Sequence, residues 1–471
     1  MVLLSPPSLR PLDEDMTDTS LKAPQDAQVG PITRFLRATE IDTRLLGMFG
    51  ALLIIWIGFH LYPGLRDFFA ALFDETISAR DAFAMLSPAT LWGKGAFLTA
   101  QNLWFLSVQS ASIGIMATGM VLVIITRNID LSVGAILGVT AMVMGLFQVE
   151  WLPQYLGLGH PMIWVLTMIL GIFVGGSIGA FQGSLIAYRG IPSFIVTLGG
   201  LLIWRGFAFL SANGRTISPV DSKFQLLGGG PYGAVGQVGS YIFGGIAIAA
   251  ILYLIWSGRQ SRKRHDFPLR PVWAEVTMAC IGCGLVIVSV LVVNAYPWPK
   301  GILKQQGLAE DVFVSHGFAI PVLIMVAVAI AMTIMMNRTR FGRYVFAIGG
   351  NPEAAALSGI NVKWMTLKIF ALMGALAGLS AVIASARLNS ATNALGLIDE
   401  LYVIAAAVIG GTSLAGGVGT IYGAILGAYV MQSLKSGMVL IGFDSAVQQI
   451  VVGSVLVVAV YLDNVYRRST K

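Results

Sequence analysis

Charged residues are scarce in this chain of 471 residues, and the scarcity limits the kind of protein it can be. Lysine, arginine, aspartate and glutamate together make up 11% of the sequence, whereas 56% of the residues are hydrophobic. A soluble domain carries roughly 25% charged residues. A chain with so little charge cannot cover a water-facing surface, but it can cover a surface that faces lipid. The composition therefore predicts a membrane protein.

Residues that carry redox, metal or acid–base chemistry are also few. The two cysteines, Cys280 and Cys283, lie in one apolar run with no partner ligand nearby, so we interpret them as inert helix-packing residues. The four histidines are scattered, each near the end of an apolar run or in a loop: His60, His160, His265 and His316. An embedded enzyme would need a convergent cluster. We therefore expect no catalytic residue and no metal site.

The chain also lacks its own source of energy for transport. The ATP-binding pattern GxxxxGK[ST] fails, because the Gly93-Lys94 pair is followed by Gly95. Few charges lie deep in the apolar runs, which argues against an ion-coupled secondary sugar transporter, the alternative that we keep open. The deepest is Arg205, for which snorkelling to the interface and a role in the pathway are both open. The energy is expected to come from another polypeptide.

Long apolar runs are what the sequence has in abundance. A spanning helix needs ~20 mostly apolar residues, and about twelve runs approach that length. They are 45–62, 108–126, 132–150, 162–187, 193–211, 240–257, 274–293, 317–336, 367–385, 399–413, 417–434 and 445–462. We therefore predict an all-α polytopic bundle of about 12 transmembrane helices. The short runs are candidates for half-helices, which are common in transporters.

The distribution of basic residues predicts the orientation. Basic residues favour the cytoplasmic connections, and here they follow alternate runs, with clusters at 259–270 and 338–343. Residues 1–44 read as a flexible cytoplasmic tail, and 466–471 as a cytoplasmic C-terminus. We assign the net charge of +7 to these topology signals, so no nucleic-acid partner is expected, and membrane lipids are the expected surroundings of the apolar runs.

One connection, residues 337–366, carries a further pattern. Asn351, Pro352 and Glu353 form a plausible helix start, with an N-cap, a proline at the first position and an acid in the first turn. Gly359 would end a helix of about two turns. A short rigid helix on the inner face suits a permease that receives force from a motor subunit, although an ordinary surface helix fits the periodicity equally well.

Four separated stretches carry a family resemblance. Glu353-Ala354-Ala355 with Gly359 resembles the EAA…G loop with which permeases of ABC importers dock their ATPases. The surrounding residues 341–362 and the stretches 128–134, 192–198 and 409–417 resemble the xylose/ribose branch of these permeases, and the likeness covers roughly residues 100–465. An extra helix pair at about 240–293 resembles the xylose type.

The resemblance implies an ABC importer transmembrane domain over residues 45–465 that translocates a monosaccharide across the bacterial inner membrane by alternating access, and the likeness to the xylose type favours D-xylose as that sugar. It implies three protein partners: an ABC ATPase subunit, a periplasmic sugar-binding protein and a second permease copy in a homodimer. ATP-Mg would be used by the ATPase, with no cofactor bound by this chain. The ATPase-coupling residues would be Arg343, Glu353, Ala354, Ala355 and Gly359.

The sugar path can be approached only by residue type. A neutral polar sugar needs hydrogen-bonding groups without strong charge. Asn128, Gln182, Asn213 and Thr412 fit by type and depth. Hydrogen bonding between helices explains each of them at least as well.

Overall fold

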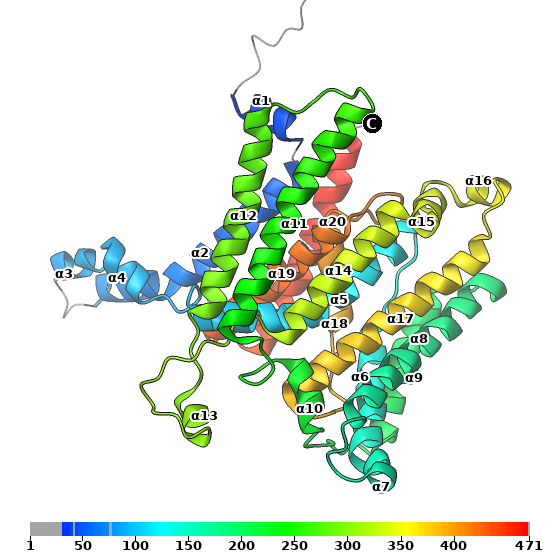
Figure 1. The fold of residues 1–471 in the computed structure, drawn as a ribbon, viewed down its shortest axis with the longest axis horizontal. Helices are drawn as coiled ribbons and strands as arrows, with labels where there is room; N and C mark the ends of the chain where they lie inside the picture. Colours follow the sequence, from blue (N-terminus) through cyan, green and yellow to red (C-terminus); the bar gives the residue numbers. More distant parts are fainter. Residues whose placement is uncertain (1–30, 41–42, 75–77, 470–471) are drawn as a thin grey trace, which may run out of the picture.

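The computed structural model describes residues 31–40, 43–74 and 78–469 (Figure 1). Within these ranges every regular secondary-structure element is a helix. The only β-pairing in the described chain consists of isolated bridges, such as that between Ile217 and Ala391. The predicted all-α class is therefore confirmed. Nine helical segments of the described chain are long and apolar enough to cross a membrane. They are α2 (Thr43–Leu72), α5 (Ala100–Ile125), α6 with α7 (Val133–Leu156), α8 (Ile163–Arg189), α9 (Ser193–Leu210), α11 (Gly236–Arg264), α12 (Val272–Asn294), α14 (Ile320–Arg338) and α17 (Val362–Leu388).

The last three predicted runs also form helices, namely α18 (Asp399–Ile409), α19 (Ile421–Leu440) and α20 (Ser445–Ser469). The first two of these differ from the nine spans above. At 1.5 Å per residue α18 is about 16 Å long, about half the hydrocarbon thickness, as expected for a half-helix. Polar Gln432, Ser433 and Lys435 lower the hydropathy of α19. The total of twelve spans thus stays a prediction.

Shorter helices lie in the connections and at the N-terminal side. They are α1 (Pro31–Thr39), α3 (Ala79–Ala84), α4 (Pro88–Gly93), a π-helical turn (Phe147–Trp151) between α6 (Val133–Leu146) and α7 (Leu152–Leu156), α10 (Ser222–Gln225), a 3₁₀ turn (Leu226–Gly228), α13 (Lys300–Gln305), α15 (Arg340–Gly350) and α16 (Pro352–Leu357). The predicted tail 1–44 lies mostly outside the described residues, but its described part includes α1 and the start of α2. The predicted C-terminal segment from 466 continues α20 up to Ser469.

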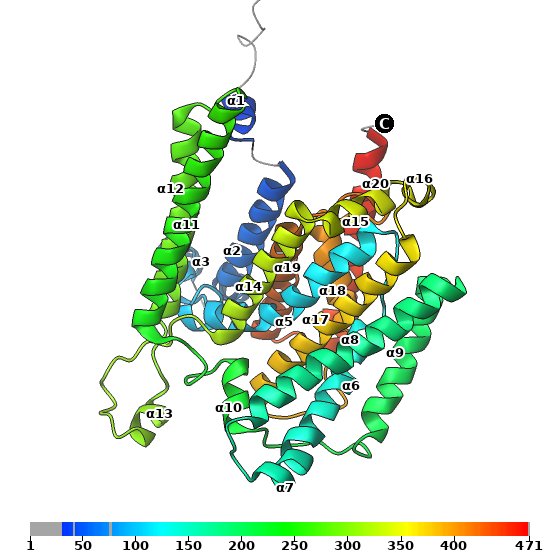
Figure 2. The same ribbon diagram turned by 45° about the vertical axis from the view of Figure 1, so that its right-hand side comes forward.

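The bundle has a buried centre and a lipid-exposed periphery. In their most apolar windows α5 is 89% buried and α17 is 78% buried, whereas α2, α11 and α12 are each 11% buried. Figure 2 places α5 and α17 in the middle and the α11–α12 pair at the left side, and Figure 1 shows the same pair in front of α2. Such a gradient is expected where helices bury small residues against each other and leave apolar side chains to lipid.

A glycine face joins α8 to α17. Gly175 of α8 lies so close to the backbone of Gly374, and Gly179 so close to the backbone of Phe370, that an added Cβ would collide with it. Gly378 of α17 is in turn closed off by the backbone of Gly171. Close approach of this kind is the usual purpose of small residues four apart in membrane helices. The four-residue spacing of glycines in α8 is therefore explained by packing.

The extra helix pair is present as α11 and α12, which pack on each other. Cys283 is half-buried on α12, but Cys280 is exposed on the helix surface. The interpretation of Cys280 as a helix-packing residue is therefore wrong, since its side chain lies on the face of α12 that other helices leave uncovered.

Candidate functional site

The four sequence stretches singled out above meet at one end of the bundle. The hydroxyl of Ser193 accepts a hydrogen bond from the backbone N–H of Ile129 (3.4 Å), and the Thr197 hydroxyl donates to the Ile129 carbonyl (3.3 Å). The backbone N–H of Gly417 donates to the carbonyl of Ile125 at 3.0 Å. The end that carries α15 and α16 is therefore a single contiguous assembly (Figure 1).

Arg127 connects this assembly to α15. Its Nε donates to the carbonyl of Gly349 at 3.0 Å, and a second guanidinium nitrogen donates to the carbonyl of Gly350. These are carbonyls of the last turn of α15, where a cation is favourable because the helix dipole is negative there. The α5–α6 connection thereby fixes the point from which α16 projects.

Helix α16 has the boundaries predicted from the sequence. The Asn351 side chain accepts hydrogen bonds from the backbone N–H groups of Glu353 (2.9 Å) and Ala354 (3.0 Å), and Pro352 occupies the first turn. Gly359 has φ of +87°, and the following N–H, of Ile360, returns to the carbonyl of Ala355 at 3.1 Å. A left-handed residue just beyond the helix is the usual place for glycine.

The surface of α16 suits contact with another protein. Of the predicted coupling residues, Arg343, Glu353, Ala354 and Gly359 are exposed, whereas Ala355 is buried against the bundle. The neighbouring Leu357 is 91% exposed. A large apolar side chain that is exposed outside the spans gains free energy when a partner protein covers it. The coupling role itself stays a prediction.

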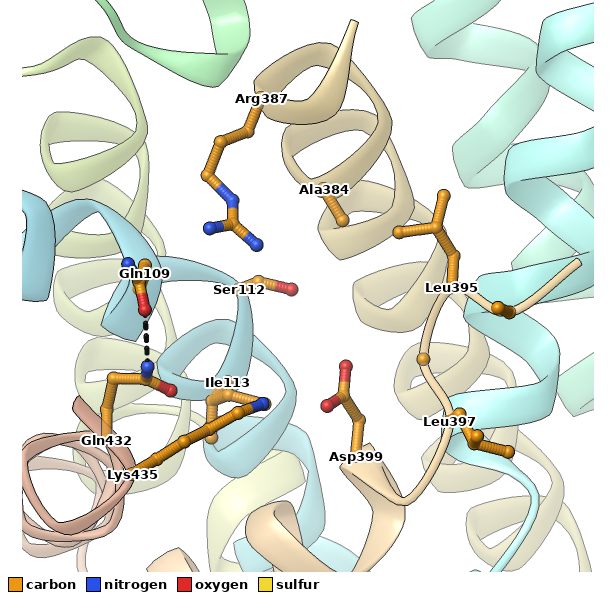
Figure 3. Close-up of a pocket in the computed structure, with 12 residues that line it drawn as sticks. Gln109, Ser112, Ile113, Ala384, Arg387, Leu395, Leu397, Asp399, Gln432 and Lys435 are labelled. Carbon is orange, nitrogen blue, oxygen red and sulfur yellow. Dashed lines mark hydrogen bonds between the residues drawn. The ribbon is translucent and has the colours of Figure 1, made fainter. Parts of the chain in front are cut away.

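A polar cavity of about 200 Å³ lies inside the bundle. It is lined by α5, the end of α17, the segment leading into α18, and α19. Figure 3 shows Gln109, Arg387, Asp399, Gln432 and Lys435 facing it. The amide of Gln432 donates to the side-chain oxygen of Gln109 at 2.7 Å. The cavity therefore offers donors, acceptors and charges of both signs in one place.

The three charged side chains of the cavity are not neutralised by direct contact. Arg387 and Lys435 point toward the same space as Asp399, yet none of the ion pairs within 4 Å in the described ranges involves them (Figure 3). The Nζ of Lys435 lies 4.8 Å from the centre of the Tyr402 ring. The Ser112 hydroxyl, also in the lining, is buried without a hydrogen-bond partner in the described chain. These groups are free to bind a small polar molecule.

Arg205 holds one wall of the cavity. Its guanidinium donates to the carbonyls of Asn393 (3.0 Å), Leu395 (2.7 Å) and Gly396 (3.0 Å). These hydrogen bonds hold the segment 393–396, which precedes the N-terminus of α18, in one position. Snorkelling to an interface, one of the two roles left open for Arg205, does not describe this geometry, because the hydrogen bonds tie it to the bundle.

The four predicted path residues are not brought together. None of them lines the cavity. Gln182 accepts from the Ser132 hydroxyl (2.8 Å), Asn128 donates to the carbonyl of Thr126 (3.0 Å), Thr412 is buried and Asn213 is exposed. Their role in sugar passage stays a prediction. The described residues also contain no group of three or more metal-ligating side chains.

The charged cavity residues were missed because they lie at or just beyond the ends of the apolar runs. Arg387 and Lys435 follow runs that we end at 385 and 434, and Asp399 opens the short run of α18. The available signal was that Arg387 and Asp399 flank one connection, residues 388–398. Opposite charges on both sides of a connection into a half-helix could have indicated a site.

The sequence of this chain is similar to those of known transport proteins. Residues 102–460 match the model of a family described as "Branched-chain amino acid transport system / permease component". The xylose transport system permease protein XylH of Escherichia coli K12 is 37% identical over 79% of this chain and 87% of its own length. The ribose import permease protein RbsC of the same organism is 32% identical over 78% and 87%, respectively.

A further relative is the D-allose transport system permease protein AlsC of Escherichia coli K12, at 27% identity over 78% of this chain and 84% of its own length. No solved structure matches the chain. The family match covers well over half of the sequence, and sugar permeases recur among the similar proteins. The chain therefore belongs to this family of ABC transporter permeases, and within it to the xylose/ribose type.

Proposed function

We propose that the chain is the membrane-spanning subunit of a binding-protein-dependent importer of D-xylose in a bacterial inner membrane. The observation that carries the substrate is the order of identities: 37% to a xylose permease, 32% to a ribose permease and 27% to an allose permease. The extra α11–α12 pair supports the xylose type. Nothing in the described chain supports the ion-coupled alternative.

The energy would come from a separate ATPase that binds α16. The exposed Leu357 and Glu353 would contact the motor, and the Arg127 hydrogen bonds at the end of α15 would pass its movement to α5 and α6. Coupling requires the motor to bind the two permease states with different free energy. The permease then alternates between inward-open and outward-open states, and this chain itself binds no ATP.

The polar cavity would form part of the sugar passage. A pentose presents hydroxyl groups that both donate and accept, and the cavity supplies amides from Gln109 and Gln432. Contrary to the expectation of a path without strong charge, it also holds the Asp399 carboxylate and two cations, which can donate to or accept from sugar hydroxyls as well. The amino-terminal end of α18 faces it, as half-helix ends do in other transport proteins. With the termini in the cytoplasm, the cavity lies in the outer half of the bundle, where a delivered sugar would arrive.

The surroundings of the chain follow from its exposed surfaces and charges. We assign both termini to the cytoplasm from the basic connections. A periplasmic binding protein would deliver the sugar, and a second copy would complete the translocation unit. Large apolar side chains stay exposed on α9 and α11, for example Leu202 at 68% and Leu254 at 68%, and lipid or the second copy would cover them.

The test of the substrate is uptake of radiolabelled xylose, ribose and allose by cells that lack this chain, with and without its gene restored. We expect the deletion to abolish xylose uptake and to leave the other sugars unchanged. Loss of ribose or allose uptake alone would contradict the xylose assignment and keep the permease. An Asp399→Asn variant, present at normal levels in the membrane, is expected to reduce xylose uptake at least tenfold.

A further inference from the structure

A second cavity, of about 310 Å³, lies at the base of the α11–α12 pair. One part of its lining is aliphatic, with Leu254, Ile255 and Met278, and the other part is ionic. The ionic part comprises Arg259, Arg262, Arg270 and Glu275. A cavity with an apolar part and a basic part fits an amphiphile with an acidic head, whereas a neutral sugar would leave the apolar part unmatched.

The basic part carries an excess of positive charge and an open donor. Arg259 pairs with Glu275 at 2.7 Å, whereas the guanidiniums of both Arg262 and Arg270 converge on the single carboxylate of Glu40. The Nε of Arg270 is buried with no hydrogen-bond partner in the described chain. Three cations thus face two anions, and one donor is left for a further acceptor.

The contacts of Glu40 show that Arg262 and Arg270 can bind one oxyanion together. The Nη2 of Arg262 donates to both carboxylate oxygens of Glu40, at 3.0 Å (Oε1) and 2.8 Å (Oε2). The Nη2 of Arg270 donates to Oε2 alone, at 2.6 Å. Hydrogen bonds from Arg270 and Arg262 lower the pKa of Glu40 below its usual range. Two guanidiniums bracketing one oxyanion is a geometry that a phosphate diester satisfies as well as a carboxylate does.

The cavity also lies at the level of lipid headgroups. Tyr253 and Trp256, just before the basic cluster on α11, are 62% and 58% exposed, and such rings favour the boundary between acyl chains and water. Leu254, in the apolar part, is 68% exposed. The aliphatic part therefore opens toward acyl chains, while the arginines stand at headgroup height.

We propose that this cavity is a binding site for an anionic phospholipid, whose phosphate is held by Arg262 and Arg270 and whose acyl chains lie along Leu254 and Met278. The Glu40 carboxylate competes with the phosphate for the same two guanidiniums. Bound lipid therefore releases the Glu40 carboxylate, which follows α1, from the base of α11 and α12. The site is separate from the sugar cavity and does not depend on which sugar is carried.

The test is a native mass spectrometry titration of the full-length purified protein with phosphatidylglycerol, with phosphatidylcholine as the zwitterionic lipid. We expect phosphatidylglycerol to bind more tightly. The double variant Arg262→Gln/Arg270→Gln should weaken its binding by about tenfold or more, since each lost cation is worth about fivefold near a membrane surface. The matched control, Lys263→Gln/Arg264→Gln, removes the same charge from exposed neighbours outside the cavity and should weaken it much less.

A third variant is expected to change phosphatidylglycerol binding in the opposite direction. Glu40→Gln removes the competing carboxylate and should strengthen phosphatidylglycerol binding about fivefold, a gain that a misfolded protein would not show. Equal losses in the two double variants, or weaker binding by Glu40→Gln, would overturn the proposal. So would displacement of the lipid by inorganic phosphate at equal concentration, because the site would then be one for the free anion. Since the readout is lipid binding, it stands apart from any result on uptake.

Discussion

Gly359 is one of the predicted coupling residues, and its backbone has a left-handed conformation. Its φ of +87° lies in the left-handed region, while a Cβ built there would meet no atom within 4 Å. Gly350, nine residues earlier, is equally open but has an ordinary φ. A left-handed conformation costs a residue with a side chain about 1–2 kcal/mol. The end of α16 therefore depends on glycine for its backbone and not for space.

We predict that Gly359→Ala reduces sugar uptake severalfold at unchanged membrane levels, because the C-terminal end of α16 is displaced. Gly350→Ala is the matched control and should leave uptake within twofold of the native protein. Both are measured as initial rates of labelled xylose entry, normalised to the amount of protein in the membrane. Equal rates for the two variants would show that the turn at Gly359 has no part in coupling.

Asp130, in the connection between α5 and α6, gives a pH-dependent prediction. Its carboxylate accepts from the backbone N–H and the hydroxyl of Ser132 at 2.8 and 2.6 Å, but its second oxygen has no hydrogen-bond partner in the described chain. Burial raises the pKa to about 6, from a usual value of 3.8. The folded state therefore holds this proton more tightly than the unfolded state.

The sign follows from linkage: ionisation costs folding free energy that grows as the pH rises from 3.8 to about 6 and is constant above. We predict that Asp130→Asn, which cannot ionise, becomes more stable relative to the native protein by about 1–2 kcal/mol between pH 5 and pH 7.5. Thermal unfolding of the detergent-purified proteins at both pH values measures it. A difference that does not change with pH would mean that Asp130 is not buried as described.

At the scale of elements, α16 and α18 show that local sequence signals can predict the boundaries and length of a short helix. The Asn351 cap, Pro352 and Gly359 are local signals, and they define the boundaries of α16 correctly. The short run at 399–413 indicates a half-helix, and α18 has 11 residues. In contrast, the cavity is formed by side chains from α5, α17, α18 and α19, and periodicity within one helix cannot say which faces of four helices will meet.

The exposed tip of α16 carries the third prediction. Leu357 is 91% exposed there, and Leu158, in the connection after α7, is 90% exposed at the other end of the bundle. We predict that Leu357→Asp weakens binding of the ATPase at least tenfold, as loss of an apolar anchor does, and that Leu158→Asp leaves it unchanged. Co-purification of the ATPase with each variant is the measurement. If both variants retain the ATPase, Leu357 is not an anchor.

The loop before α18 carries the fourth prediction. Arg205→Met removes three hydrogen bonds from a cation to backbone carbonyls and should lower the free energy of unfolding by about 2–4 kcal/mol. Arg215→Met removes a contact to Glu150 at 3.5 Å between exposed side chains and should cost less than about 1 kcal/mol. Thermal unfolding compares the two. If both variants lost a similar amount of unfolding free energy, Arg205 would not hold the loop before α18.

At the scale of the whole molecule, the sequence predicted the class and the family and left the arrangement open. Scarce charge and long apolar runs predict a helical membrane protein by themselves, and four stretches in the right order identify the family. Their convergence is a tertiary property, visible only in contacts such as that of Arg127 with Gly349. The depth of a charge is also tertiary: Arg205 is deep in its run, but the hydrogen bonds that explain it come from residues 393–396.

Transport of D-xylose by this chain, driven by a separate ATPase, can be tested in a reconstituted system. Labelled xylose is measured inside proteoliposomes that contain the purified permease and its ATPase, with the sugar-binding protein outside and ATP-Mg inside. We expect accumulation that requires all three proteins and ATP, is lost with Gly359→Asp and is retained with Gly350→Ala. Accumulation driven by an ion gradient without the ATPase would show that the chain is an ion-coupled transporter instead.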